Sequence, residues 1–274
     1  MAIQVSGTQV ISNSRGLTNI ASVDATTAAS ITAAGVGGGA TAGPVWSPSA
    51  TPDVTLTGSG TYSISGVADD VWVVFYMVGG GCGGIRSYGS AAQQGGAAYV
   101  WTALSQDVPS SISYSAGAGG AATFGHSSNV GADTTMTASG VTVTAPGGKQ
   151  VNSSDNTAST LSNFALLPSP FNTGAVPTQG FGTTYNINGG RGVSHDVNQN
   201  GLSNTVLGAG GGGAGSGSFP GGTSTYAGNG GTSSRTGTNT AGSVPGGGGG
   251  SSYHGSSQGG KSGGTGNIRI YYID

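Results

Sequence analysis

The chain has 274 residues, of which 58 are glycine and only 6% are charged, and its formal net charge is −2. Proteins ordinarily contain about 7% glycine and about 25% charged residues, and disordered segments are normally rich in charge, so this composition argues against ordinary disorder. The glycines follow no strict three-residue repeat with abundant proline, which excludes collagen. No run of basic residues provides an electrostatic footprint for nucleic acid, so no nucleic-acid partner is expected.

The cysteine content and the apolar runs narrow the class of protein further. Cys82 is the single cysteine, so it cannot form an internal disulfide, and no cluster of histidine and cysteine suggests a metal site. Neither a metal nor a cofactor is expected. The first residues lack the basic and apolar regions of a signal peptide, and the longest apolar run, 71–78, is shorter than the roughly 20 residues of a membrane helix. The sequence predicts a protein made in a cytoplasm without a standard export signal.

Residues 1–40 contain short strand-like apolar spots, at Ile3, Val5, Val10 and Ile11. Asp24 then stands as an N-cap before an alanine-rich segment, which predicts a short helix ending at Gly35. This region has too little apolar area to fold alone and needs a partner chain or a docking surface. In residues 41–54, prolines flank Trp46, which predicts an extended linker or collar.

From residue 55 onward, strand-like stretches alternate with glycine tracts, apart from an insertion at about 150–207. VTLTGSGTYSISG predicts a hairpin that turns at Gly58–Gly60, and residues 71–78 predict a buried strand that runs directly into glycines. GGAAYVWTAL, SSISYSAGAGG and TTMTASGVTVTAPGG repeat this arrangement. The chain closes on NIRIYYID, with Ile268, Ile270 and Tyr272 on one face of a strand and Arg269 and Tyr271 on the other.

The glycine tracts between good strands have two interpretations. Polyglycine adopts a left-handed helix with three residues per turn and no internal hydrogen bonds, so buried tracts must pair their backbone groups with neighbouring tracts. Several converging tracts can share the entropic cost of ordering glycine. The alternative is that they are flexible linkers. The regular alternation of strands and tracts favours ordered packing, and the expected fold is mostly β with packed polyglycine-II-type helices after a short N-terminal attachment segment.

The order of these motifs resembles the glycine-rich domain of bacteriophage tail-fibre proteins. VADDVWVVFYMVGGGCGG is similar to the opening strand of that domain, GGAAYVWTALSQDVPSSISYSAGAGG to its next two strands, GGAATFGHSS with MTASGVTVTAPGG to the following unit, and GGTGNIRIYYID to its closing strand. The organisation also resembles the tip adhesins of T-even-like long tail fibres, where a sandwich of polyglycine helices presents variable loops to the host. The resemblance spans most of residues 55–274 except the insertion. Residues 1–40 more loosely resemble the attachment or trimerisation segment of phage fibre proteins.

Three motifs that suggest chemistry are better explained without it. GSSQGGKS, from Gly255 to Ser262, matches the phosphate-binding loop pattern, but no strand is expected before it and no helix after it. Neighbouring residues such as His195 and Asp196 point to opposite faces of an extended strand, although a loop would permit them to pair. The Asp69–Asp70 pair lies in a turn-like context. Glutamate is absent and aspartate scarce. We therefore expect no enzymatic activity, with Lys261 a loop or surface charge and Cys82 a small buried residue.

Aromatic residues in glycine-rich surroundings are the candidates for receptor binding, because glycine tracts offer almost no side-chain surface of their own. They are Tyr88, Phe219, Tyr226 and Tyr253 with His254, together with Phe171, Phe181 and Tyr185 in the insertion. Aromatic rings give large and fairly rigid contact area for sugars or receptor loops. The alternative for each single residue is that its ring fills a gap beneath its loop.

The resemblance implies a virion fibre protein, assembled in the host cytoplasm, that binds a protein or glycan of the host surface. Residues 1–40 would attach it to other fibre or tail proteins and form a homo-oligomer, with a trimer favoured by the fibre-like N-terminus. The alternative is a structural fibre or decoration protein that binds no receptor, and a third, weaker reading is an envelope-degrading enzyme.

Overall fold

The computed structural model describes residues 3–5, 8–11, 46–87, 91–124, 130–152, 167–168, 207–213, 218–234, 238–253 and 259–273. The chain divides into two units, Met1–Gly43 and Pro44–Asp274. In the first, β1 (Ile3–Val5) pairs antiparallel with β2 (Thr8–Ile11), which confirms the strands predicted there. The helix predicted up to Gly35 lies outside the described residues.

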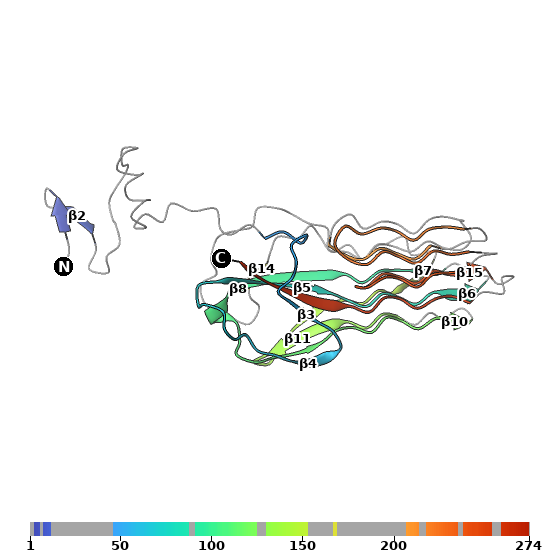
Figure 1. Ribbon diagram of the computed structural model, residues 1–274, viewed down its shortest axis with the longest axis horizontal. Coiled ribbons are helices and arrows are strands. Elements are labelled where there is room, and N and C mark those ends of the chain that lie inside the picture. The colour runs from blue at the N-terminus through green and yellow to red at the C-terminus, as the bar shows by residue number, and fades with distance from the viewer. Residues whose placement is uncertain are drawn as a thin grey trace. The chain divides into compact units, whose positions relative to one another are not determined.

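The second unit is mostly β and is built on two sheets (Figure 1). The order of the larger sheet is β14 (Leu167–Pro168), β8 (Ala98–Leu104), β5 (Trp72–Val78), β16 (Asn267–Ile273) and β3 (Val54–Leu56). The order of the smaller sheet is β12 (Val141–Ala145), β11 (Thr134–Ala138), β9 (Ile112–Ser115) and β4 (Ser59–Tyr62). All these pairs are antiparallel except β14 with β8. Within the described residues, the single helical element is the 3₁₀ turn η1 (Ser105–Asp107).

The hairpin predicted around Gly58–Gly60 is wrong. β3 pairs with β16 and β4 pairs with β9, so the turn at Gly58 passes the chain from one sheet to the other. Gly58 has φ +68° there, which suits glycine. Both strands are short, and each gains more pairing and burial beside a strand in the middle of a sheet than beside the other. A hairpin forms instead between β11 and β12, through Ser139 and Gly140, both at positive φ as a type I′ turn requires.

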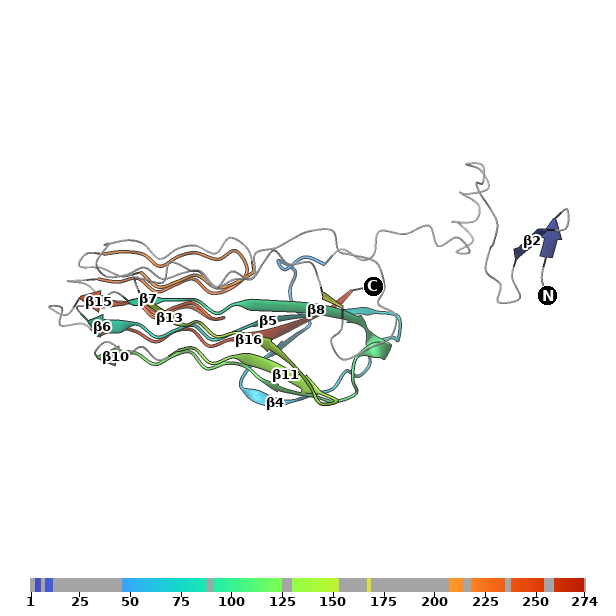
Figure 2. The same ribbon diagram turned by 180° about the vertical axis from the view of Figure 1, so that it is seen from behind.

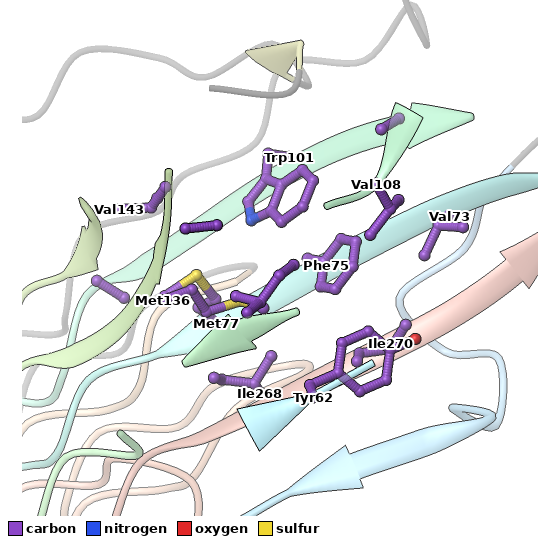
Figure 3. Close-up of a cluster of buried hydrophobic side chains, with 14 residues drawn as sticks. Tyr62, Val73, Phe75, Met77, Trp101, Val108, Met136, Val143, Ile268 and Ile270 are labelled. Atoms are coloured by element: carbon purple, nitrogen blue, oxygen red, sulfur yellow. The ribbon is translucent and has the colours of Figure 1, made fainter. Parts of the chain in front are cut away.

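The main hydrophobic core lies between the two sheets. Phe75 and Trp101 stack at its centre, with ring centroids 3.9 Å apart and planes 7° from parallel. Met77 and Met136 lie beside them, one from each sheet (Figure 3). The core also contains residues from β4, β9, β12 and β16.

β5 is buried on both faces, which explains its uninterrupted apolar sequence. Val73, Phe75 and Met77 face the core between the sheets, whereas alternate residues such as Tyr76 join a second cluster on the other face. That cluster includes Trp46, which is 5% exposed and makes edge-to-face contacts with Tyr76 and Tyr271. The described part of the segment predicted as a linker or collar therefore packs onto the domain.

Each of six long strands continues directly into a glycine tract. The tracts are 79–84 after β5, 93–97 before β8, 117–121 after β9, 130–133 before β11, 146–149 after β12 and 260–266 before β16. Along 79–84 the direction of the backbone hydrogen bonds repeats every three residues: Gly79 and Cys82 donate to tract 93–97, whereas Gly81 and Gly84 donate to tract 260–266. Gly80, between them, donates to Ala132. The two-residue period of the strands thus becomes a three-residue period in the tracts.

Because the bonds leave a tract in several directions, a tract can be surrounded on all sides. Tract 79–84 exchanges hydrogen bonds with six others: 93–97, 117–121, 130–133, 146–149, 246–251 and 260–266. A β-strand, in contrast, pairs with neighbours in one plane only. The tracts therefore form a hydrogen-bonded lattice in three dimensions.

Further tracts that continue no long strand extend this lattice (Figure 2). They comprise 207–213, 218–222, 228–234, 238–243 and 246–251. Tract 207–213 joins the layer of the larger sheet, because Ala209 and Gly212 donate to tract 93–97. Tract 246–251 also has six hydrogen-bonded neighbours, so the lattice grows outward without added strands.

At most glycine positions inside the lattice there is no room for a side chain. A Cβ on Gly96 would lie 1.9 Å from the carbonyl oxygen of Gly79, well inside van der Waals contact. Along 117–121, larger residues stand where the tract faces solvent: Gly117 and Gly120 are buried, whereas Ala118 and Ala121 are exposed. Glycine in this protein is therefore a packing requirement.

At the edge of the larger sheet, directly before β3, the side chain of Asp53 accepts a hydrogen bond from β16 in place of a strand backbone. Its Oδ2 accepts a hydrogen bond of 2.7 Å from the backbone N–H of Tyr272, while the Asp53 N–H donates to Ile270. We expect Asp53→Ala to lower the free energy of unfolding by about 1 kcal/mol, as for the loss of a capping side chain. Asp53→Asn keeps an acceptor oxygen and should lose less. Urea denaturation of both variants tests this, and equal losses would contradict it.

Buried tyrosines make the fold sensitive to alkali. Burial raises the pKa of Tyr76 above its ordinary value of 10.0, against the opposing effect of Arg269, and burial with a hydrogen bond to Tyr272 raises the pKa of Tyr62. Because the folded pKa is the higher one, this stability is fully present below pH 10 and decreases as pH rises above it. For Tyr76, the decrease is about 1.4 kcal/mol per pH unit.

Urea denaturation from pH 8 to pH 11.5 measures this decrease. Tyr76→Phe removes one titrating group and the hydrogen bond that Tyr76 donates to the carbonyl of Leu207. The variant should start less stable at pH 8 yet lose stability less steeply above pH 10. Parallel curves for the two proteins would contradict the assignment.

Candidate functional site

The second unit has two distinct ends, which we call the strand end and the tract end. The strand end is the end at which the long strands do not continue into glycine tracts. Asp69–Asp70 and η1 lie there. At the tract end, glycine tracts change into short strands: β6 (Ile85–Ser87), β10 (Thr123–Phe124) and β15 (Ser252–Tyr253) in parallel, and β7 (Ala91–Gln93) antiparallel to β13 (Gln150–Asn152) (Figure 1). The chain reverses direction there between successive tracts.

Buried polar residues gather near the tract end, whereas most buried apolar residues lie in the two clusters between and behind the sheets. The polar set is Gln93, Gln94, Ser233, Ser234, Asn239, Ser251 and Ser252. Asn239 is 1% exposed; its Oδ1 accepts from the N–H of Ser234 at 2.6 Å and its Nδ2 donates to the carbonyl of Gly259 at 2.7 Å. One side chain thereby joins three tracts just below their turns.

Ser251 performs a similar role on another pair of tracts. Its buried hydroxyl accepts a hydrogen bond of 3.1 Å from the N–H of Ile85, the first residue of β6. Sequence reasoning missed both Asn239 and Ser251, because serine, threonine and asparagine recur throughout the glycine-rich region. The signal that could have found them is their place at the last positions before and after a turn between tracts. They fix the ends of the tracts from which the connecting segments emerge.

Of the aromatic candidates, Phe219 and Tyr253 lie at the tract end. Phe219 is half-buried and pairs its backbone with Ser233, and Tyr253 ends β15, where it pairs with Ser87. Tyr226 lies elsewhere, because its backbone oxygen accepts from Arg269 of β16 at 2.7 Å and its ring packs on the second core cluster. The structure therefore does not bring Tyr226 together with the other two.

The remaining aromatic candidates and His254 lie outside the described residues, as do His195 and Asp196. These candidates are Tyr88, Phe171, Phe181, Tyr185 and His254.

The described residues of the other sequence motifs lie in glycine tracts and in a turn. The described end of GSSQGGKS, residues 259–262, leads through a glycine tract into β16, and Lys261 exchanges backbone hydrogen bonds with Gly84 and Gly250. Cys82 is buried within a tract, as predicted. Asp69 and Asp70 form an exposed turn. Among the described residues, no group of three or more His, Cys, Asp or Glu could hold a metal ion, and no described helix could span a membrane.

Comparison with known proteins identifies a domain family. A family model described as a glycine-rich domain matches residues 54–273, which correspond to both sheets and the whole tract lattice. A search of curated proteins found no match.

Proposed function

The chain belongs to the glycine-rich domain family, and we propose that it is a bacteriophage fibre protein that binds the host cell surface through its tract end. The observation that supports this is the arrangement of the lattice: tracts hydrogen-bonded to one another throughout carry the chain to one end and turn there repeatedly. Loops on a rigid scaffold are the usual place for binding residues. The buried Asn239 and Ser251 fix the tract ends without a hydrophobic core.

We further propose that the tracts are polyglycine-II-type helices. A three-residue period of hydrogen-bond direction and six neighbours for a tract are what helices with three residues per turn require when they pack side by side. The glycine Cα–H groups would add weak contacts to neighbouring carbonyls.

Hydrogen exchange provides the test of this packing. We expect the amides of tracts 79–84 and 246–251 to exchange only through global unfolding, because each is bonded to tracts on several sides. Exposed positions such as Ala118 serve as an internal comparison. Exchange of the interior glycine amides at the rate of an unfolded chain would contradict the packing.

In this proposal the protein acts by adhesion and catalyses no reaction. Residues 1–40 attach it to other fibre or tail proteins and form the oligomer, with a trimer favoured. Several copies on one virion then raise the effective concentration of individually weak contacts. The binding surface includes Phe219 and Tyr253 at the tract end.

The decisive experiment measures the binding of labelled full-length protein to a panel of bacterial strains. We expect saturable binding to at least one strain and competition with adsorption of the virus that carries the protein. Phe219→Ala should weaken that binding about tenfold or more, as for loss of an aromatic contact residue. Tyr226→Ala is the matched control, since it removes another half-buried ring at a distance from the tract end.

The outcomes separate adhesion from the structural alternative. Absence of binding to every strain by a folded oligomer, together with virions that fail to assemble without the protein, would assign it a structural role. Equal loss of binding in the Phe219 and Tyr226 variants would contradict the tract end as the contact surface. Release of sugar fragments from cell envelopes would instead support an enzyme.

A further inference from the structure

Although the net charge of the chain is only −2, most of the described acidic and basic residues of the second unit lie towards opposite ends of it. Four of the five described aspartates of this unit lie towards the strand end: Asp53, Asp69, Asp70 and Asp107. Asp53 is held by the last residues of β16, Asp69 and Asp70 precede β5, and Asp107 closes η1 after β8. The fifth, Asp133, stands where a tract meets β11 and accepts a hydrogen bond from the N–H of Gly147.

Three of the four described basic residues of this unit lie at the tract end. Arg86 is the middle residue of β6. The backbone oxygen of Lys261 accepts from Gly84, two positions before Arg86, and Lys261 is half-buried. Lys149 is exposed directly before β13, and its backbone oxygen accepts from Gln94. The fourth, Arg269, lies in β16, where it contacts the Tyr76 ring and the Tyr226 carbonyl.

The two groups of charges are too far apart to neutralise each other. From Asp70 to Arg86 the chain runs as β5, tract 79–84 and the start of β6, which at about 3.1–3.3 Å per residue corresponds to about 50 Å. The Debye length at physiological ionic strength is about 8 Å. A ligand at the tract end therefore meets the basic residues without the described aspartates of the strand end.

We propose that the tract end binds a polyanionic polysaccharide of the cell surface, one that carries phosphate or carboxylate groups. This deepens the proposed function and rests on it for the location of the partner. Lys149 and Lys261 supply complementary charge at the end where Phe219 supplies an aromatic ring for the apolar face of a sugar. The charge acts mainly on the rate of encounter and on the choice of partner.

The test uses the full-length protein with dextran sulfate and dextran, which share one sugar backbone and differ in charge. We expect binding to dextran sulfate and none to dextran. The logarithm of the dissociation constant should rise with the logarithm of salt concentration with a slope of about 2–3, because roughly one counterion is released for each basic residue engaged. Binding to dextran as strong as to dextran sulfate would overturn the proposal.

The double variant Lys149→Gln with Lys261→Gln assigns this binding to the tract end. It should bind dextran sulfate at least tenfold more weakly and lower the salt slope by about two. Thr51→Asp is the control: it lowers the net charge at an exposed position near Asp53 and should leave binding unchanged. An unchanged double variant, or an equal loss in the control, would overturn the proposal.

Three further results separate this proposal from its alternatives. Tighter binding to double-stranded DNA than to dextran sulfate, at equal concentration of anionic groups, would overturn the choice of a polysaccharide in favour of nucleic acid. Cell binding that persists at high salt and in the double variant would leave the proposed adhesion intact while overturning its anionic ligand. Dextran sulfate binding without binding to any cell would uphold the anion-binding surface while contradicting the adhesin.

Discussion

Replacement of Gly249 by alanine is expected to prevent stable folding, with a loss of more than about 4 kcal/mol in the free energy of unfolding. A Cβ at this position would lie 1.9 Å from the carbonyl oxygen of Lys261. The backbone cannot move aside, because Gly249 donates to Cys82 while Gly248 and Gly250 donate to two other tracts. The added methyl group must therefore break hydrogen bonds in several directions.

Thermal unfolding and the yield of soluble protein measure this effect. Ala118→Ser is the control, because it adds an atom at an exposed position of a tract and should change the free energy of unfolding by no more than about 0.5 kcal/mol. Wild-type stability of Gly249→Ala would show that the tracts are loosely packed and would contradict the close contact of Gly249 with Lys261.

Replacement of Trp101 by alanine should cost about 3–5 kcal/mol, the range for removal of a large aromatic ring from a core. Trp101 is fully buried, stacks on Phe75 and lies between the two sheets. The surrounding core side chains are held in two paired sheets, so they can fill the resulting cavity only in part. Trp101→Phe keeps a ring on Phe75 and should lose only about 1–2 kcal/mol.

Urea denaturation followed by far-ultraviolet circular dichroism measures both tryptophan variants. A comparable loss in Trp101→Ala and Trp101→Phe would show that the indole ring is not replaceable by another stacked ring. Loss of less than about 1 kcal/mol in Trp101→Ala would contradict its central position in the core.

The strands were predictable because their side chains carry information about burial. The apolar run 71–78 and the alternation in NIRIYYID both gave strands with the expected faces: Ile268, Ile270 and Tyr272 pack on the main core, whereas Tyr271 packs on the second cluster. Pairing was less predictable. The short strands on either side of Gly58 read as a hairpin, but each belongs to a different sheet, because pairing depends on distant partners that a local pattern does not contain.

The glycine tracts show the limit of sequence reasoning most clearly. Their positions follow from the sequence, but the neighbours of each tract do not, because glycine has no side chain that could select them. The pairing of the long strands sets the neighbours of the tracts that continue them, and the turns set the others. The same reasoning explains the aromatic candidates: Tyr226 and Tyr253 stand in similar glycine-rich sequence, yet the chain reverses between them and places Tyr226 away from the tract end.

The three-residue period of the tracts restricts how this gene can change in length. If the tracts are helices with three residues per turn, as proposed, deletion of one residue within a tract turns everything after it by about a third of a revolution. This would direct an exposed residue such as Ala118 towards the positions that Gly117 and Gly120 occupy. Loss or gain of three residues restores the pattern and only shortens or lengthens the tract. Insertions between tracts meet no such restriction. Natural variants of this protein should therefore differ freely in loop length, while their tracts change in steps of three codons. New loop sequences can then arise on an unchanged tract framework.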